Sequence, residues 1–193
     1  MRIDSVSQSP DRAGRYLVKF SDGSSMKLYR QTVEDFRMFP GMEIEDLDAV
    51  RESNSRYSAK MRAVRIISAS AVSRRDLETR LVRKGESEEQ ARAAVEWLSD
   101  LNLVDDRQTA RQIVERCIHK GYGLQRARQA LYEKQIPKDL WEEVLEDYPD
   151  QLDRIADFLR TKLRDPEDPK QVKRAIDAAL RRGHSYGEVK RAL

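Results

Sequence analysis

The sequence predicts a mainly α-helical protein: three tandem three-helix repeats forming an elongated, curved array, with a small β-rich appendage at the N-terminus. Three observations predict this fold. Apolar residues recur at spacings of three and four from about residue 58 onward, similar loops recur with a period near 49 residues, and alternating apolar residues are confined to the first 50 positions. The composition agrees, because 37% of the 193 residues are charged and only eight are Gly and six Pro.

The β-rich appendage is expected over residues 1–57. Alternating apolar residues at 16–20 and 26–29 flank Asp22-Gly23, which predicts a β-hairpin, and residues 3–6 supply a candidate third strand. A short helix is expected from about residue 32 to 39, with Thr32 and Asp35 in capping-box register and Pro40-Gly41 after it.

Nine helices of ten to fourteen residues are predicted after the appendage, in repeats over residues 58–104, 105–150 and 151–193. The loops Lys84-Gly85-Glu86-Ser87 and Arg182-Gly183-His184-Ser185 share a basic helix end, a Gly at the C′ position and a Ser that caps the next helix. Lys134-Gln135-Ile136-Pro137 lies midway between them. This spacing is the main observation that predicts three copies.

Charge is segregated along the chain although the net charge is only +3. Lys and Arg exceed Asp and Glu by seven over residues 51–84, by five over 111–138 and by five over 170–193, whereas acids dominate 85–110 and 139–169. Because stacked repeats present the same side of each unit in one direction, this pattern predicts a basic stripe that attracts phosphate backbones or an acidic protein surface. The alternative is solvated helix faces with local ion pairs.

Catalytic chemistry has few candidates in this sequence. Asp105-Asp106 is a paired carboxylate at a helix start, where Asp106 is expected to be the N-cap and a nuclease role is disfavoured. Cys117 is expected to be a buried, inert thiol, and His119 and His184 to lie near helix ends. We therefore expect no catalytic residue, cofactor or metal. No run approaches the roughly 18 apolar residues of a membrane span, so we expect no membrane association and a cytoplasmic protein.

Two stretches resemble the RecX family, bacterial regulatory proteins that modulate the recombinase RecA. The first is Ser73-Arg74-Arg75-Asp76-Leu77 with Arg80-Leu81, and the second runs from Leu103-Val104-Asp105-Asp106 through Lys120-Gly121-Tyr122-Gly123 to Ile136. The matching motif positions are Asp105, Asp106, Lys120, Gly121, Gly123, Arg126, Leu131 and Lys134. The chain departs from the family at Thr109, where an aromatic is usual, and at Gln135, where a Gly is usual.

The resemblance implies a non-enzymatic regulator that binds the RecA–single-stranded DNA filament and inhibits its recombinase, ATPase and coprotease activities, and so affects DNA repair, recombination and the SOS response. Single- or double-stranded DNA is a further expected partner, and nothing requires more than a monomer. The candidate contacts to the filament or DNA are Arg74, Arg75, Lys120, Tyr122, Arg126, Arg128, Lys134, Arg174, Arg181 and Arg182. Tyr122 is either an exposed anchor or a residue that packs at the start of the next helix. The alternative function is an independent nucleic-acid-binding helical repeat protein.

Overall fold

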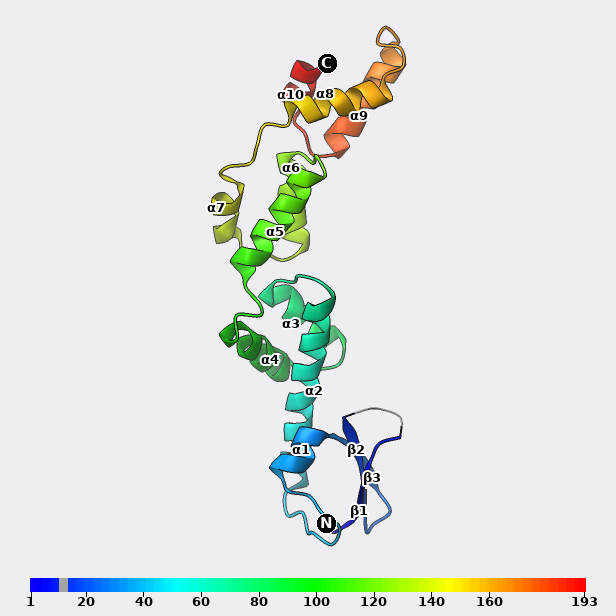
Figure 1. The fold of residues 1–193 in the computed structure, drawn as a ribbon, viewed down its shortest axis with the longest axis vertical. Coiled ribbons are helices and arrows are strands. Elements are labelled where there is room, and N and C mark those ends of the chain that lie inside the picture. The colour runs from blue at the N-terminus through cyan, green and yellow to red at the C-terminus, as the bar shows by residue number, and fades with distance from the viewer. Residues whose placement is uncertain (11–13) are drawn as a thin grey trace. The chain divides into compact units, whose positions relative to one another are not determined.

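The computed structural model describes residues 1–10 and 14–193, which are mainly helical with one small N-terminal sheet (Figure 1). They divide into two compact units: the first unit comprises Met1–Ser70 and Leu77–Leu103, and the second unit comprises Ala71–Asp76 and Val104–Leu193. The fold class expected from the sequence, mainly α with helices in successive groups of three and an N-terminal β-rich segment, is confirmed. The predicted repeat boundaries stay predictions.

The sheet is three-stranded and antiparallel, in the order β1 (Ile3–Gln8), β2 (Arg15–Phe20) and β3 (Ser25–Tyr29). The predicted Asp-Gly turn joins β2 to β3: Gly23 has a φ of 83°, and the Asp22 carboxylate accepts a 2.9 Å hydrogen bond from the Ser24 amide. Side chains from all three strands form a buried cluster with residues that follow the sheet.

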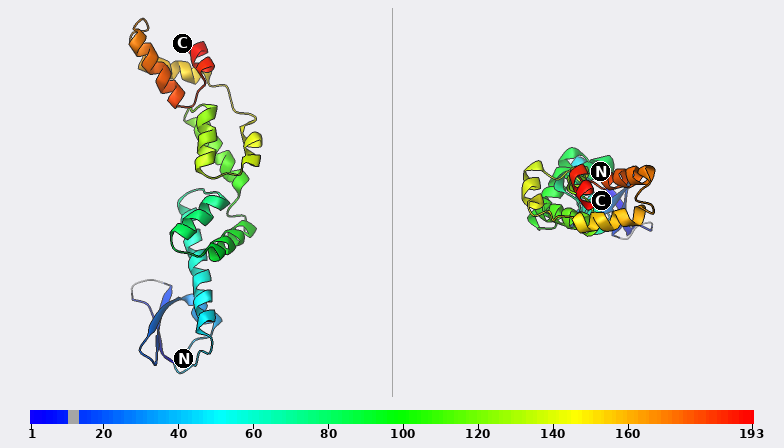
Figure 2. Two further views of the ribbon diagram at one scale, coloured as in Figure 1. Left: turned by 180° about the vertical axis from the view of Figure 1, so that it is seen from behind. Right: turned by 90° about the horizontal axis from the view of Figure 1, so that it is seen from above.

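The first long helix, α2 (Leu47–Ala69), starts eleven residues earlier than the repeat pattern predicts. Asp46 caps it by accepting a hydrogen bond from the Ala49 amide, and the buried Val50 belongs to the cluster under the sheet. The strands run beside the first turns of α2 in the rear view of Figure 2. One helix therefore continues from the core of the sheet into the first helical group and begins before the segment in which the sequence showed helical spacing.

The remaining helices are α3 (Arg74–Arg83), α4 (Glu88–Asp100), α5 (Asp106–His119), α6 (Leu124–Glu133), α7 (Trp141–Leu145), α8 (Leu152–Lys162), α9 (Pro169–Arg181) and α10 (Tyr186–Ala192). Two short helices differ from expectation. Helix α1 (Arg30–Asp35) begins and ends earlier than predicted, because Thr32 is fully buried within it and does not cap it. Helix α7 is a five-residue helix that follows the 3-10 turn η1 (Lys138–Leu140), which starts after Pro137. None of the described helices is long and apolar enough to cross a membrane.

The three matched loops have the same backbone conformation. Residues 85, 135 and 183 have φ values of 92°, 52° and 88°, so each occupies the left-handed region just after the middle helix of its group. In each loop the next amide reaches back to a carbonyl five residues earlier, as in the Glu86–Leu81 and Ile136–Leu131 hydrogen bonds. Gln135 adopts the left-handed conformation that a Gly would reach at lower cost. The backbone of this loop therefore matches the loops at Gly85 and Gly183, as the sequence predicted, although the residue differs.

Candidate functional site

The loop between α5 and α6 carries the motif Lys120-Gly121-Tyr122-Gly123. Gly121 has a φ of 63°, which lets the Tyr122 amide donate to the Cys117 carbonyl at 3.0 Å and closes the end of α5. The Tyr122 ring is half-buried against the core formed by α5, α6 and α7. Burial raises the pKa of Tyr148 to about 12, so its hydroxyl stays protonated and donates a 2.6 Å hydrogen bond to the Tyr122 carbonyl. Tyr122 thus packs at the start of α6, and a role as a binding anchor stays a prediction.

Two glycines join α6 to the loop between α9 and α10 through direct backbone contact. The Gly123 amide donates to the Arg182 carbonyl at 2.9 Å, and the Gln125 amide donates to the Gly183 carbonyl at 3.2 Å. A Cβ on Gly123 would lie 2.1 Å from the Gly183 oxygen, closer than any real contact allows. These carbonyls satisfy amides that the first turn of α6 would otherwise leave unpaired. The two glycines and their hydrogen bonds form what we call the glycine junction.

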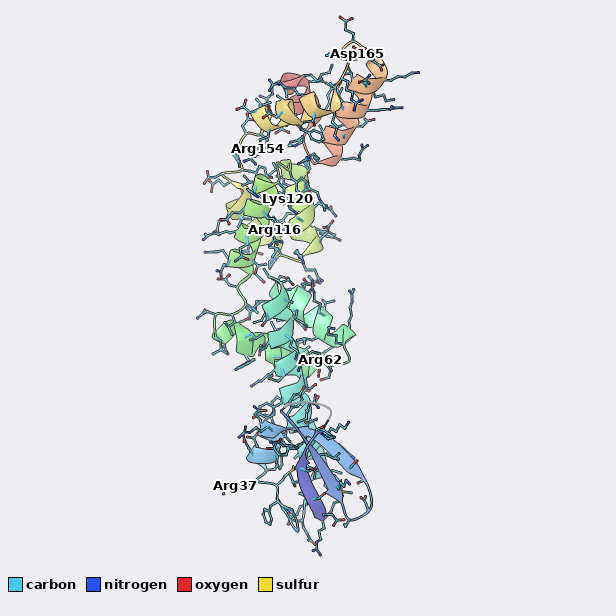
Figure 3. All side chains as sticks on the ribbon, turned by 45° about the vertical axis from the view of Figure 1, so that its right-hand side comes forward. Arg37, Arg62, Arg116, Lys120, Arg154 and Asp165 are labelled. Atoms are coloured by element: carbon cyan, nitrogen blue, oxygen red, sulfur yellow. The ribbon has the colours of Figure 1, made fainter. Side chains whose placement is uncertain are left out.

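The end of α5 receives three side-chain contacts from the C-terminal helices. Arg154 donates to the Ile118 carbonyl, Arg182 donates to the Lys120 carbonyl at 2.5 Å, and His184 Nε2 lies 3.1 Å from the Gly121 carbonyl (Arg154 and Lys120 are labelled in Figure 3). The Arg182 guanidinium also stacks over the Tyr122 and Phe158 rings. Cationic donors stabilise the carbonyl end of a helix, where the partial charge is negative. The two arginines therefore stabilise the end of α5 electrostatically, and His184 adds a hydrogen bond beside the glycine junction.

His184 lies just after the C-terminal end of α9, near a helix end as expected, and its side chain is buried. Burial lowers its pKa, outweighing the hydrogen bond to Gly121 and the nearby Glu188, both of which raise it. The neutral ring with a proton on Nε2 can donate to the Gly121 carbonyl, whereas Nδ1 has no partner among the described residues.

Acid should destabilise the second unit through His184. Because the folded state holds the neutral ring more strongly than the unfolded chain does, stability is full above about pH 6.5 and falls progressively below it. We expect the urea midpoint of His184→Gln to depend less on pH between 7.5 and 5.5 than that of the parent. The exposed-site variant His119→Gln should keep the full acid sensitivity, and equal pH dependence in all three proteins would contradict this expectation.

A contact that resembles the glycine junction joins the first turn of α3 to the loop between α6 and α7. The Ser73 hydroxyl accepts from the Asp76 amide at 3.0 Å and donates to the Lys134 carbonyl at 2.7 Å. Asp106 accepts from the Arg74 amide at 2.7 Å. Here side chains make the contact that backbone groups make at the glycine junction. The expected capping role of Asp106 on its own helix is wrong, because Asp105 caps α5 through the Arg107 and Gln108 amides.

The carboxylate and the thiol considered as catalytic candidates, those of Asp106 and Cys117, have structural roles. Burial raises the pKa of Asp106 above its usual value, and its carboxylate is committed to α3. Cys117 is buried, as expected, and burial raises the pKa of its thiol, which lowers its reactivity. No group of three His, Cys, Asp or Glu residues that could hold a metal ion occurs within the described part of the chain.

The predicted contact residues fall into two classes. The exposed members are Arg74, Arg75, Lys120, Arg128, Arg174 and Arg181. The other four members are half-buried. Tyr122 packs against the core of the second unit, Arg126 forms a 3.1 Å ion pair with Glu133, the Lys134 carbonyl accepts from Ser73, and Arg182 supports the glycine junction. Of the motif residues, Leu131 is fully buried in the core of the second unit.

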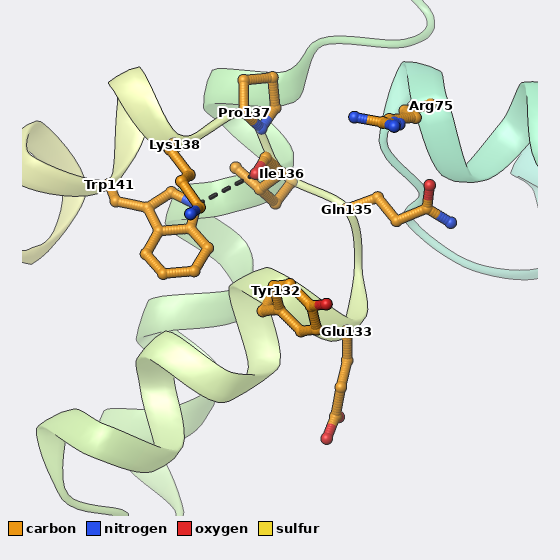
Figure 4. Close-up of a pocket in the computed structure, with 8 residues that line it drawn as sticks. All are labelled: Arg75, Tyr132, Glu133, Gln135, Ile136, Pro137, Lys138 and Trp141. Carbon is orange, nitrogen blue, oxygen red and sulfur yellow. Dashed lines mark hydrogen bonds between the residues drawn. The ribbon is translucent and has the colours of Figure 1, made fainter.

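A cavity of about 600 Å³ opens beside Arg75 and contains residues that the charge pattern did not single out (Figure 4). Tyr132 is 63% exposed there, and the Trp141 ring is held by a hydrogen bond from its Nε1 to the Ile136 carbonyl. Lys138 adds a second cation to the lining. Tyr132 follows the buried Leu131 on α6, so helical periodicity alone could have shown that it points away from the core.

Comparison with known proteins identifies related sequences and folds. Residues 105–145 match the family model "RecX, second three-helix domain". The chain is 27% identical over 139 residues to "Regulatory protein RecX" of Vibrio campbellii, covering 70% of this chain and 90% of that protein. It is 28% identical over 141 residues to the protein of that name from Mycobacterium avium, covering 69% and 82%.

Two solved structures share the fold. "Crystal structure of regulatory protein RecX" aligns with a TM-score of 0.68 at 19% identity, covering 98% of this chain and 97% of that one. "Crystal structure of RecX from Lactobacillus salivarius" aligns with a TM-score of 0.63 at 18% identity, covering 72% and 95%.

Proposed function

The chain belongs to the RecX family of regulatory proteins, and on that premise we propose that it binds the RecA–single-stranded DNA filament and restrains its ATPase, recombinase and coprotease activities. Such restraint limits recombinational DNA repair and the SOS response. The action requires binding only, since a protein that prefers one state of a filament shifts its population without chemistry.

The observation that carries this proposal is the basic helix α6 within the region that matches the family model. Arg128 is exposed on α6, and Arg126 lies half-buried two residues before it with its guanidinium on Glu133. An Arg held by one carboxylate can still exchange that partner for a stronger anionic surface, because an exposed pair contributes at most about 1 kcal/mol.

The glycine junction supports the same proposal through preorganisation. It fixes α6 against the loop between α9 and α10, so the second unit presents residues of both segments in one arrangement. A surface that is already ordered loses less entropy on binding. The free energies of several weak contacts add when the contacts belong to one connected protein. Such a protein suits a filament that presents the same surface repeatedly.

Reversing the charge of α6 tests the proposal. We expect Arg126→Glu/Arg128→Glu to raise the concentration needed for half-inhibition of the filament ATPase at least tenfold, because two attractive contacts become repulsive. The matched control is Arg107→Glu/Arg111→Glu on α5, which changes charge equally at residues that pair with Glu143. Helicity by circular dichroism should match in all proteins. Unchanged inhibition in the α6 variant would remove this helix from the contact surface.

A titration separates the regulator from an independent nucleic-acid-binding protein, the function that the basic segments would otherwise favour. Affinity is measured for a bare single strand and for the same strand coated with ATP-bound recombinase, at about 0.15 M salt. The proposal requires that coating increase the affinity. Equal or lower affinity for the coated strand favours the independent nucleic-acid binder.

A further inference from the structure

A basic groove lies in the first unit, and none of the residues invoked for filament binding lines it. Two adjoining hollows, of about 490 and 440 Å³, share Arg65 of α2. Six cations line the hollows, from β2, α1, α2, α3 and the residue that follows α3. They are Arg15, Arg30, Arg62, Arg65, Arg80 and Lys84. Neither hollow is lined by an acidic residue among those that the structure describes.

Part of this charge is uncompensated. Arg30 pairs with Glu34 at 2.6 Å and Arg62 pairs with the buried Glu86 at 3.0 Å (Arg62 is labelled in Figure 3). Arg65 and Lys84 are exposed, and neither side chain forms an ion pair within residues 1–10 and 14–193. Uncompensated cations in a concave surface create a positive potential that concentrates anions.

We propose that this groove binds the phosphate backbone of a nucleic-acid strand. The basic lining follows α2 from Met61 to Ala69, a distance of about 12 Å, which is the axial rise of three to four nucleotides in one strand of B-form DNA. Five of the six cations are Arg, whose planar fork matches phosphate oxygens. The exposed Met61 lines the hollow of about 440 Å³ and offers apolar contact to a sugar or base.

The shape and composition favour a strand over other polyanions. A membrane surface is flat and binds proteins that present apolar residues beside cations on a protruding face, whereas these cations line hollows. A linear polyanion with repeated charges fits a lining that continues from one hollow to the next through Arg65. This surface goes beyond the proposed function, because it uses residues of the first unit and none of the predicted filament contacts.

The test uses the full chain and a fluorescent 20-nucleotide oligothymidylate, with binding followed by anisotropy at several salt concentrations. We expect Arg65→Glu/Lys84→Glu to weaken binding at least tenfold at about 0.1 M salt and to reduce the slope of log K against log salt by about 1.5, since two phosphate contacts are lost. The matched control is Arg56→Glu, nine residues or about two and a half turns before Arg65 and so on the opposite face of α2. It should bind as the parent protein does.

Several outcomes overturn the proposal. Equal losses in the groove variant and in Arg56→Glu would indicate only a general charge effect. Unchanged oligonucleotide binding, with loss of binding to poly-glutamate or to phosphatidylserine vesicles, would assign the groove to an acidic protein or to a membrane. The milder pair Arg65→Gln/Lys84→Gln, which should show a smaller loss with the same change in slope, keeps the test decisive if charge reversal disturbs folding. Because Arg126 and Arg128 are untouched, the filament ATPase assay fails or succeeds independently of this result.

Discussion

Replacing Gly183 by alanine should destabilise the second unit by about 3 kcal/mol or more. The residue has a φ of 88°, where an L side chain is strained. The added Cβ would lie 2.3 Å from the backbone nitrogen of Arg126 and 2.5 Å from the Arg126 Cβ. Both contacts are with groups close to the backbone of α6, so no flexible side chain can move aside. The glycine junction should open, with faster amide hydrogen exchange in α8, α9 and α10 and a lower urea midpoint.

Gly187 provides the matched control, since alanine there has no atom within 4 Å and the position lies inside α10. Gly187→Ala should be neutral or stabilising by up to about 1 kcal/mol, because alanine favours helix. If the free energy of unfolding of Gly183→Ala lies within about 0.5 kcal/mol of the parent value, the two loops do not approach each other this closely.

Truncating Leu131 to alanine should cost about 3 kcal/mol, the usual loss when a fully buried leucine leaves a cavity. Leu131 is 0% exposed in the core that α5, α6 and α7 form. Only two tryptophans occur in the chain, so a Trp97→Phe background leaves Trp141 as the fluorescent probe of this core during urea unfolding.

Tyr132→Ala, one position along the same helix, is the control for Leu131→Ala. The Tyr132 side chain is 63% exposed, so its loss should change the free energy of unfolding by no more than about 0.5 kcal/mol. Similar effects from the two substitutions would mean that α6 presents a different face to the core.

Local signals were sufficient for most of the secondary structure. Asp22-Gly23 predicted the hairpin, and Gly85 and Gly183 predicted the loops that end α3 and α9, because a left-handed residue is a local backbone requirement. The start of α2 was missed because Leu47 and Val50 pack against the sheet, a contact that has no counterpart in the later helical groups. The capping role predicted for Asp106 was wrong because either of two adjacent acids can cap a helix locally. Only the fold brings the Arg74 amide of α3 to Asp106 and leaves Asp105 to cap α5.

The sequence by itself determined the fold class, the loops that punctuate the helices, the buried thiol of Cys117 and the segments that carry positive charge, since each depends on residues near one another in the chain. The tertiary structure alone decided which cations are exposed and which are committed: Arg182 supports the glycine junction, whereas Arg65 lines an open groove. The physical reason is that a side chain's partners come from distant segments. Arg15 and Lys84 each line a hollow together with Arg65 of α2 only because the fold brings β2 and the end of α3 to this helix.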